Sequence, residues 1–89
     1  MRFDEFIKSE LQTRKVSFRQ FEKSSGISRG LLSRWINGHS MPQMKNILKL
    51  SKWLSNNDIE NKDLSSDEIK GLQAGYMNLI INSVVSYEL

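Results

Sequence analysis

The first part of the chain places its apolar residues at the three- and four-residue spacing of amphipathic helices. This pattern predicts four helices between the N-terminus and residue 54. In the first helix, acidic residues lie near the start and basic residues near the end, an order that suits the helix dipole. The apolar positions of this helix are Phe3, Phe6, Ile7 and Leu11.

Capping signals define a short second helix. Ser17 and Gln20 have the spacing of an S-x-x-Q capping box, which predicts a helix over residues 18–25. Gly26 follows directly, and glycine adopts the left-handed conformation that commonly ends a helix. The second helix is therefore expected to stop at a glycine turn.

A third helix is predicted over residues 28–37, where Ser28 provides the cap and an Asn-Gly pair at 37–38 ends the helix. Pro42 then marks the entry to the fourth helix. The apolar positions of the fourth helix are Met44, Ile47, Leu48, Trp53 and Leu54. We expect Trp35 and Trp53 to serve as core residues rather than as platforms for stacking.

A polar segment, residues 55–64, is expected to form an irregular linker before a last element over 65–89. Ser65 and Glu68 form another capping box, and the apolar residues behind it recur at helical spacing. They predict a fifth helix, although the β-branched residues of 79–85 leave a strand open. The predicted stripe consists of Ile69, Leu72, Tyr76, Leu79, Ile80, Val84 and Tyr87, and Met77, Ile81 and Val85 lie off it.

The composition narrows the class of protein. Eighty-nine residues are enough for one small domain, and 38% of them are hydrophobic. The absence of cysteine excludes disulfides and thiol chemistry and fits a reducing compartment. The N-terminus lacks a signal-peptide pattern, and no apolar run approaches the roughly 20 residues that cross a bilayer. We therefore expect a soluble cytoplasmic protein without a membrane segment.

Charge is distributed unevenly along the chain. Residues 1–54 hold eleven Lys and Arg against four Asp and Glu, a net charge of +7. Residues 55–89 hold two against six, a net charge of −4. This asymmetry favours a basic surface for a polyanion together with an acidic segment that has another role.

The third helix has two different faces when its residues are placed about 100° apart. The apolar face consists of Leu31, Leu32, Trp35 and Ile36. The opposite face consists of Arg29, Gly30, Ser33, Arg34 and Asn37. Arginine can bind guanine with two hydrogen bonds, and asparagine can pair with adenine, so this face suits the DNA major groove. The alternative is an exposed polar face without a ligand.

The second helix, the glycine turn and the third helix together form a helix-turn-helix unit. The run VSFRQFEKSSGISRGLLSRWINGHSMPQMKNILKLSKWL resembles the Cro and phage-repressor helix-turn-helix family, also called XRE-like, and the resemblance covers residues 1–54. Its most recognisable string is SR..LSRW.NG...P. Phe21 matches the apolar residue of the first motif helix, and Gly26 matches the turn glycine. The matching packing positions are Ile27, Leu32 and Trp35. The resemblance implies an all-α fold, a lambda-repressor-like four-helix core followed by the C-terminal helix.

The resemblance also implies DNA contacts. The base-contacting residues would be Ser28, Arg29, Gly30, Ser33 and Arg34. The phosphate-contacting residues would be Arg19, Asn37, His39, Ser40 and Lys45. We interpret His39 as a turn or surface residue rather than a metal ligand, because no second ligand lies at usable spacing.

Three residues depart from the family pattern. Phe18 stands where a glutamine often contacts phosphate, and Glu22 stands where a small alanine lets the two motif helices pack closely. Gly30 stands where a polar side chain often faces the bases. Glu22 is expected either to extend outward or to pair with Arg29 or Arg19.

The sequence contains no arrangement of residues typical of an enzyme. The single histidine has no nearby acid, and neither a glycine-rich phosphate loop nor an H-E-x-x-H motif is present. The acidic residues Asp67 and Glu68 are explained by their place in the first turn of a helix. We therefore predict a non-enzymatic protein that uses no cofactor and no metal.

Members of this family usually bind paired DNA half-sites as dimers. The fifth helix is the natural dimerisation element, through Leu72, Tyr76, Leu79, Ile80 and Val84. The alternative is that this helix folds back onto the first four and completes a monomeric core.

The combined prediction is a sequence-specific regulator of transcription that binds double-stranded DNA as a homodimer. A repressor of phage, plasmid or antitoxin type fits the size of the chain. The alternative is a helix-turn-helix scaffold that binds a partner protein, such as an antirepressor or a modulator of another regulator.

Overall fold

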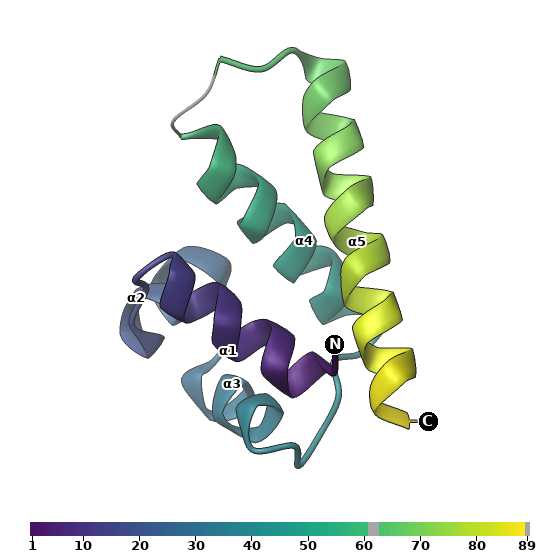
Figure 1. The fold of residues 1–89 in the computed structure, drawn as a ribbon. Coiled ribbons are helices and arrows are strands. Elements are labelled where there is room, and N and C mark those ends of the chain that lie inside the picture. The colour runs from purple at the N-terminus through teal and green to yellow at the C-terminus, as the bar shows by residue number, and fades with distance from the viewer. Residues whose placement is uncertain (61–62, 89) are drawn as a thin grey trace.

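The computed structural model describes residues 1–60 and 63–88, and all regular secondary structure in this part of the chain is α-helical (Figure 1). The helices are α1 (Phe3–Thr13), α2 (Phe18–Ser25), α3 (Arg29–Ile36), α4 (Met44–Ile59) and α5 (Ser66–Glu88). The all-helical class is therefore confirmed. Residues 79–85 are helical as well, which decides the alternative left open by their β-branched side chains.

The capping signals in the sequence form the hydrogen bonds expected of them. The Ser17 hydroxyl accepts a hydrogen bond from the Gln20 amide, and the Gln20 side chain accepts one from the Ser17 amide. The Ser28 hydroxyl accepts from the Leu31 amide at the start of α3. Gly26 ends α2 with φ +76°, the left-handed conformation that glycine adopts at little cost. Local sequence chemistry therefore defines both helices of the motif.

Helix α4 extends further than predicted. It runs to Ile59, through the first half of the segment 55–64 that was expected to be an irregular linker. Ser55 is fully buried, and its hydroxyl donates to the Lys52 carbonyl, so this polar residue is satisfied inside the helix. Asn57 and Asp58 in the last turn accept hydrogen bonds from the Arg14 side chain, which holds this turn against α1. Residues 61 and 62 lie outside the described residues.

One hydrophobic core joins all five helices. The closest aromatic contacts are edge-to-face: the ring centroids of Phe3 and Trp35 lie 5.5 Å apart, and those of Phe21 and Trp53 lie 4.9 Å apart. Both tryptophans are buried, as expected. The buried apolar residues are Phe3, Phe6, Ile7, Leu11, Phe21, Ile27, Leu32, Trp35, Ile47, Leu50, Trp53, Leu54 and Ile80.

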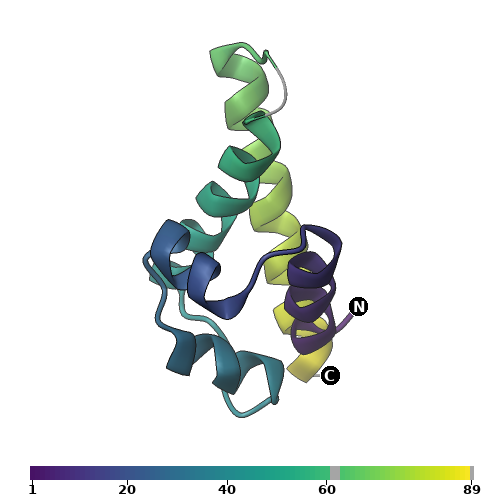
Figure 2. The same ribbon diagram turned by 90° about the vertical axis from the view of Figure 1, so that its left-hand side faces the viewer.

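Helix α5 folds back along α4 and also contacts α1, so that it completes the core of the chain (Figure 1). Both views place α3 at one end of the molecule and the connection between α4 and α5 at the other (Figures 1 and 2). The acidic start of α5 therefore lies far from α3. This arrangement is the fold-back alternative to a free C-terminal helix.

The buried face of α5 differs from the predicted stripe. Leu79 was placed on the stripe but is 53% exposed, whereas Met77 and Ile81 were placed off it and pack against the core. The reason is that α5 lies against both α4 and α1, which together cover a wider face than a single neighbour would. The side chain of Tyr87 lies outside the described residues.

The same geometry corrects the predicted dimerisation residues. Ile80 is fully buried, so its side chain is part of the core and cannot form a surface contact. Leu72 is half-buried, and Tyr76 and Val84 pack partly against the core. Leu79 is the exposed large hydrophobic residue of the predicted set.

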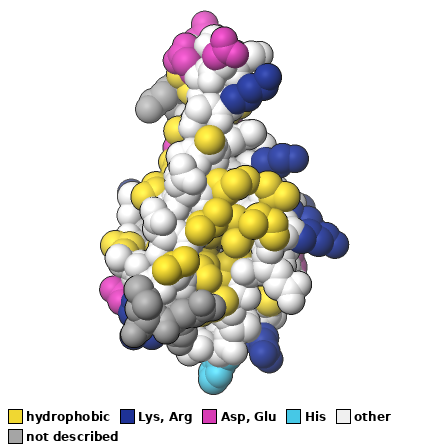
Figure 3. All heavy atoms as spheres, turned by 90° about the vertical axis from the view of Figure 1, so that its right-hand side faces the viewer, with side chains coloured by type: hydrophobic (Ala, Val, Ile, Leu, Met, Phe, Trp, Pro, Cys, Tyr) yellow, Lys and Arg dark blue, Asp and Glu magenta, His cyan; other side chains and the backbone are white. Residues whose placement is uncertain are grey.

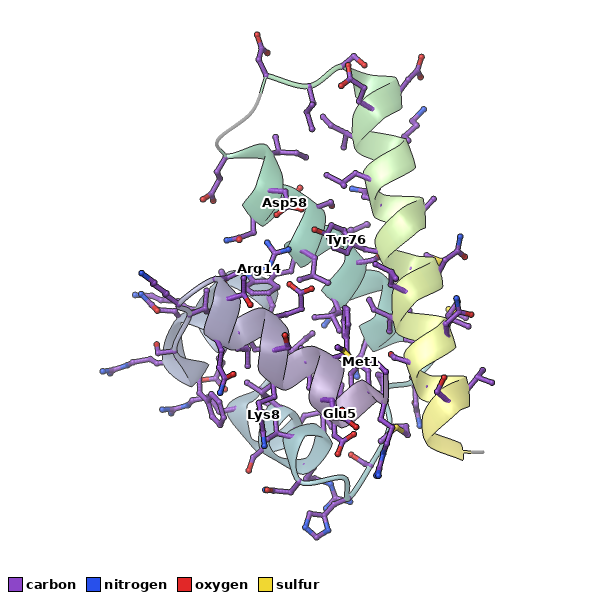
Figure 4. The ribbon with its side chains drawn as sticks, in the orientation of Figure 1. Met1, Glu5, Lys8, Arg14, Asp58 and Tyr76 are labelled. Carbon is purple, nitrogen blue, oxygen red and sulfur yellow. The ribbon has the colours of Figure 1, made fainter. Side chains whose placement is uncertain are left out.

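Arg14 connects three helices through its guanidinium group (Figure 4). Its Nε donates to Glu10 at 2.9 Å, its Nη1 donates to Asn57 at 2.7 Å and to Asp58 at 2.8 Å, and its Nη2 donates to the Tyr76 hydroxyl at 2.9 Å. The Tyr76 hydroxyl in turn donates to Asp58. The Arg14 side chain is 11% exposed, and two carboxylates compensate for the partial burial of its charge.

This cluster changes the titration of two groups. Burial lowers the pKa of Arg14, but the hydrogen bonds with Glu10, Asp58 and Tyr76 outweigh burial and raise that pKa above its ordinary value. Burial raises the pKa of Tyr76 above its ordinary value of 10.0, and the hydrogen bond that it donates to Asp58 raises it further, against the opposing effect of Arg14. Arg14 is therefore charged and Tyr76 neutral at neutral pH.

We expect Tyr76→Phe to lower the free energy of unfolding at pH 7 by about 1–3 kcal/mol, because it removes hydrogen bonds to charged partners. The pKa of Tyr76 is higher in the folded than in the unfolded protein, so its stabilisation is complete below the unfolded pKa near 10 and is lost as pH rises through the folded pKa. Urea unfolding between pH 9 and 11 should therefore show a smaller loss of stability for Tyr76→Phe than for the wild type. Parallel pH curves would contradict this interpretation of the cluster.

Candidate nucleic-acid interface

Helix α3 presents one face to the core and the other to solvent. Leu32 and Trp35 are fully buried, and Leu31 and Ile36 pack partly against the core. Because α3 is held on this side, its opposite face is turned outward at the end of the molecule, below α1 and α2 (Figure 2). The two faces predicted for this helix are therefore the two faces found.

Helix α2 is held against α4 by aromatic and polar contacts. Phe21 packs on the Trp53 ring, and the Trp53 indole N–H donates to the Ser24 hydroxyl at 2.7 Å. Residues 26–28 then connect α2 to α3 with a turn that places the two helices side by side in contact. This is the geometry of a helix-turn-helix unit, in which one helix crosses the DNA backbone and the next enters the groove.

Four of the predicted base-contacting residues are exposed, and Ser33 is half-buried. The Ser28 hydroxyl is engaged in capping α3, and the Ser33 hydroxyl accepts a long hydrogen bond of 3.4 Å from Asn37. Arg34 lies exposed in the last turn of α3, and no hydrogen bond or ion pair among the described side chains involves its guanidinium group. Its five donors are therefore available to a ligand.

The predicted phosphate-contacting residues come from α2, from the turn after α3 and from the start of α4. Arg19 is exposed in the first turn of α2, and Lys45 is exposed in the first turn of α4. Asn37 and His39 are exposed after α3, where the histidine projects at the tip of the molecule (Figure 3). Ser40 differs, because its hydroxyl oxygen is buried and has no hydrogen-bond partner among the described residues. Its side chain does not face a ligand in this conformation.

A model of a helix-turn-helix family, HTH_3, matches residues 7–54, which is more than half of the chain and includes most of α1 through α4. The chain belongs to this helix-turn-helix family. The family comprises DNA-binding regulators of the XRE type, and it is not a family of enzymes. No curated protein and no solved structure matches the chain significantly.

Glu22 is accommodated in this helix-turn-helix unit as a bridge between its two helices. One carboxylate oxygen, Oε2, accepts a hydrogen bond from the Arg29 amide at 2.8 Å, and Oε1 lies 3.2 Å from the Arg29 Nε. Of the two arrangements expected for Glu22, pairing with Arg29 is the one found. Its contact with the first amide of α3 links α2 to α3 where a small residue would have allowed closer packing.

A shallow hollow between α2 and α3 adds one residue that the sequence analysis missed. It is lined by Arg19, Gln20, Glu22, Lys23 and Arg29. Lys23 lies four residues after Arg19 on α2, so both project on one side of that helix. This i,i+4 spacing of two cations is the signal in the sequence that could have identified Lys23.

Residues 1–60 and 63–88 contain no group of three or more histidine, cysteine or acidic side chains that could hold a metal ion. None of the helices in this part of the chain is long and apolar enough to span a membrane.

Two glycines of the unit should respond oppositely to substitution. A Cβ at either Gly26 or Gly30 would meet no atom within 4 Å, so backbone conformation alone decides the outcome. Gly26→Ala should lower the free energy of unfolding by about 1–2 kcal/mol, because φ is +76° there. Gly30→Ala should raise it by up to about 1 kcal/mol, because alanine favours the helix. Urea unfolding of both variants measures this, and changes of the same sign would contradict the two conformations.

Proposed function

We propose that this protein is a sequence-specific transcriptional regulator of the repressor kind, with α3 in the major groove of double-stranded DNA. The observation that carries the proposal is the outward face of α3, which offers the exposed arginines Arg29 and Arg34 while the opposite face is locked in the core. Arginine is the side chain that most often recognises guanine in the major groove. Binding of such a protein to an operator would block the access of RNA polymerase to that DNA. The proposed place of action is the cytoplasm.

The placement of charge supports this orientation. Arg19 of α2, His39 of the turn after α3 and Lys45 of α4 are exposed, and we propose that they and Asn37 contact phosphates on either side of the groove. Acidic side chains gather at the opposite end of the molecule, around the connection between α4 and α5 (Figure 3). The resulting field attracts DNA at the α3 end and repels it at the other.

Arg34→Ala should weaken binding to the preferred DNA site by about 1–3 kcal/mol, because it removes a base contact. The site is first selected from a random pool of duplexes, and the affinities for it and for unrelated DNA are then measured by gel shift. Lys70→Ala is the matched control, because it removes an exposed cation on α5, away from α3. The control should leave the ratio of specific to non-specific affinity unchanged.

Salt dependence distinguishes this proposal from a scaffold that binds a partner protein. DNA binding should weaken steeply as ionic strength rises, because phosphate contacts release counterions. A protein that enriches no DNA sequence at any salt concentration would contradict the proposed function.

We further propose that the regulator acts as a homodimer through an apolar surface of α5 centred on Leu79. Leu79 is 53% exposed and lines a shallow hollow on α5 together with Gly71, Leu72, Gly75 and Tyr76. One helix-turn-helix unit buries little DNA surface, so a second copy on an adjacent half-site would supply the affinity that specific binding needs.

Leu79→Asp should shift the monomer–dimer equilibrium toward monomer by at least about tenfold, because a carboxylate would be buried in the apolar contact. Sedimentation velocity over a range of concentrations measures this. Val85→Asp is the control, because Val85 is also exposed on α5 but lies six residues further on and therefore on another side of the helix. Equal effects of the two substitutions, or none, would exclude this surface. A truncation would be less informative, because removal of α5 uncovers the core around Ile80.

A further inference from the structure

The Glu22 carboxylate holds Arg29 at two points of the same residue. Oε2 accepts from the Arg29 amide at 2.8 Å, and Oε1 lies 3.2 Å from Nε, at the root of the guanidinium group. No hydrogen bond among the described residues uses the terminal nitrogens Nη1 and Nη2 of Arg29. The Arg29 side chain, 58% exposed, is therefore paired with Glu22 at Nε, while its two outermost donors remain available.

A carboxylate at this position requires an explanation, because it stands on the surface proposed to face DNA. Negative charge there repels phosphates, and it also occupies an amide at the start of α3. The Leu31 amide is occupied as well, by the Ser28 hydroxyl. Two of the first three amides of α3 are thus occupied within the protein, so most of the contribution of α3 to binding is expected to come from its side chains.

The charges around Glu22 reduce the electrostatic penalty. Arg19, Lys23 and Arg29 line the same hollow, so three cations surround one carboxylate. The local charge therefore remains positive toward a phosphate backbone. Glu22 can orient one of these cations while the region as a whole still attracts DNA.

We propose that Glu22 is a positioning residue that aims the terminal nitrogens of Arg29 at one guanine of the operator, so that the Glu22–Arg29 pair determines specificity at that base pair. The inference rests on the proposed function of α3. A guanidinium group gripped through Nε can still donate two parallel hydrogen bonds to guanine O6 and N7. Orienting the side chain before binding also reduces the conformational entropy that is lost on contact.

Arg34 provides the internal comparison. It lies on the same helix, but no carboxylate among the described residues holds it. Discrimination that depends on Arg34 should therefore be independent of Glu22, whereas discrimination that depends on Arg29 should not.

The test measures the affinity of the full-length protein for its selected duplex and for variants of that duplex changed at one base pair at a time. Arg29→Ala should reduce discrimination at one base pair by about tenfold or more. Glu22→Gln keeps an oxygen for the Arg29 amide but removes the ion pair, and it should reduce discrimination at the same base pair by about threefold to fivefold. In the Arg29→Ala background, Glu22→Gln should change nothing further.

Glu60→Gln is the matched control, because it removes the same charge from an exposed residue at the end of α4. It should change the affinity for all duplexes equally and leave discrimination intact. If Glu22→Gln behaves like this control, or lowers discrimination equally in the Arg29→Ala background, the positioning role is wrong although the proposed function stands. A wild-type protein that enriches no sequence overturns both.

Discussion

The burial of Trp35 against Phe3 is the contact on which the presentation of α3 depends. Helix α3 has eight residues, which is too short for a stable isolated helix, so its conformation depends on tertiary packing. The Trp35 ring meets Phe3 edge-on at 5.5 Å, and Leu32 beside it is fully buried. Together these contacts prevent rotation of α3 about its axis. The polar face is turned outward because the apolar face is buried in the core.

The features that could be predicted from the sequence are those that contacts between neighbouring residues determine. The caps of α2 and α3 and the glycine turn are formed by residues within four positions of each other, and the structure confirms them. The last turn of α4 and the position of α5 involve instead long-range contacts such as those of Arg14, whose partners lie 43 and 62 residues away along the chain. No local pattern indicates that Asn57 will meet an arginine from the first helix, so the polar segment was interpreted as a linker.

The candidate DNA-binding site likewise has some features that local sequence predicts and others that depend on tertiary packing. The exposure of Arg34 follows from helical periodicity alone, but the inward orientation of the Ser40 hydroxyl depends on how the turn after α3 packs. The partner of Glu22 was undecided between two arginines, because the choice depends on the distance between α2 and α3. In the structure the first amide of α3, that of Arg29, lies 2.8 Å from the Glu22 carboxylate. Glu22 therefore pairs with Arg29 and not with Arg19.

Arg14 and Arg29 have different roles: Arg14 links helices of the fold, whereas Arg29 is proposed to contact DNA. Arg14 pairs with the carboxylates of Glu10 and Asp58, and its hydrogen bond to Tyr76 holds α5 in a fixed position against α1 and α4. In the proposed dimer, that rigidity would transmit the orientation of the α5 surface to α3. The molecule measures 37 × 28 × 22 Å, so two such subunits side by side can place their α3 helices about one DNA turn apart, roughly 34 Å. The spacing of half-sites would then depend on Arg14, through the contacts by which it holds the helices together.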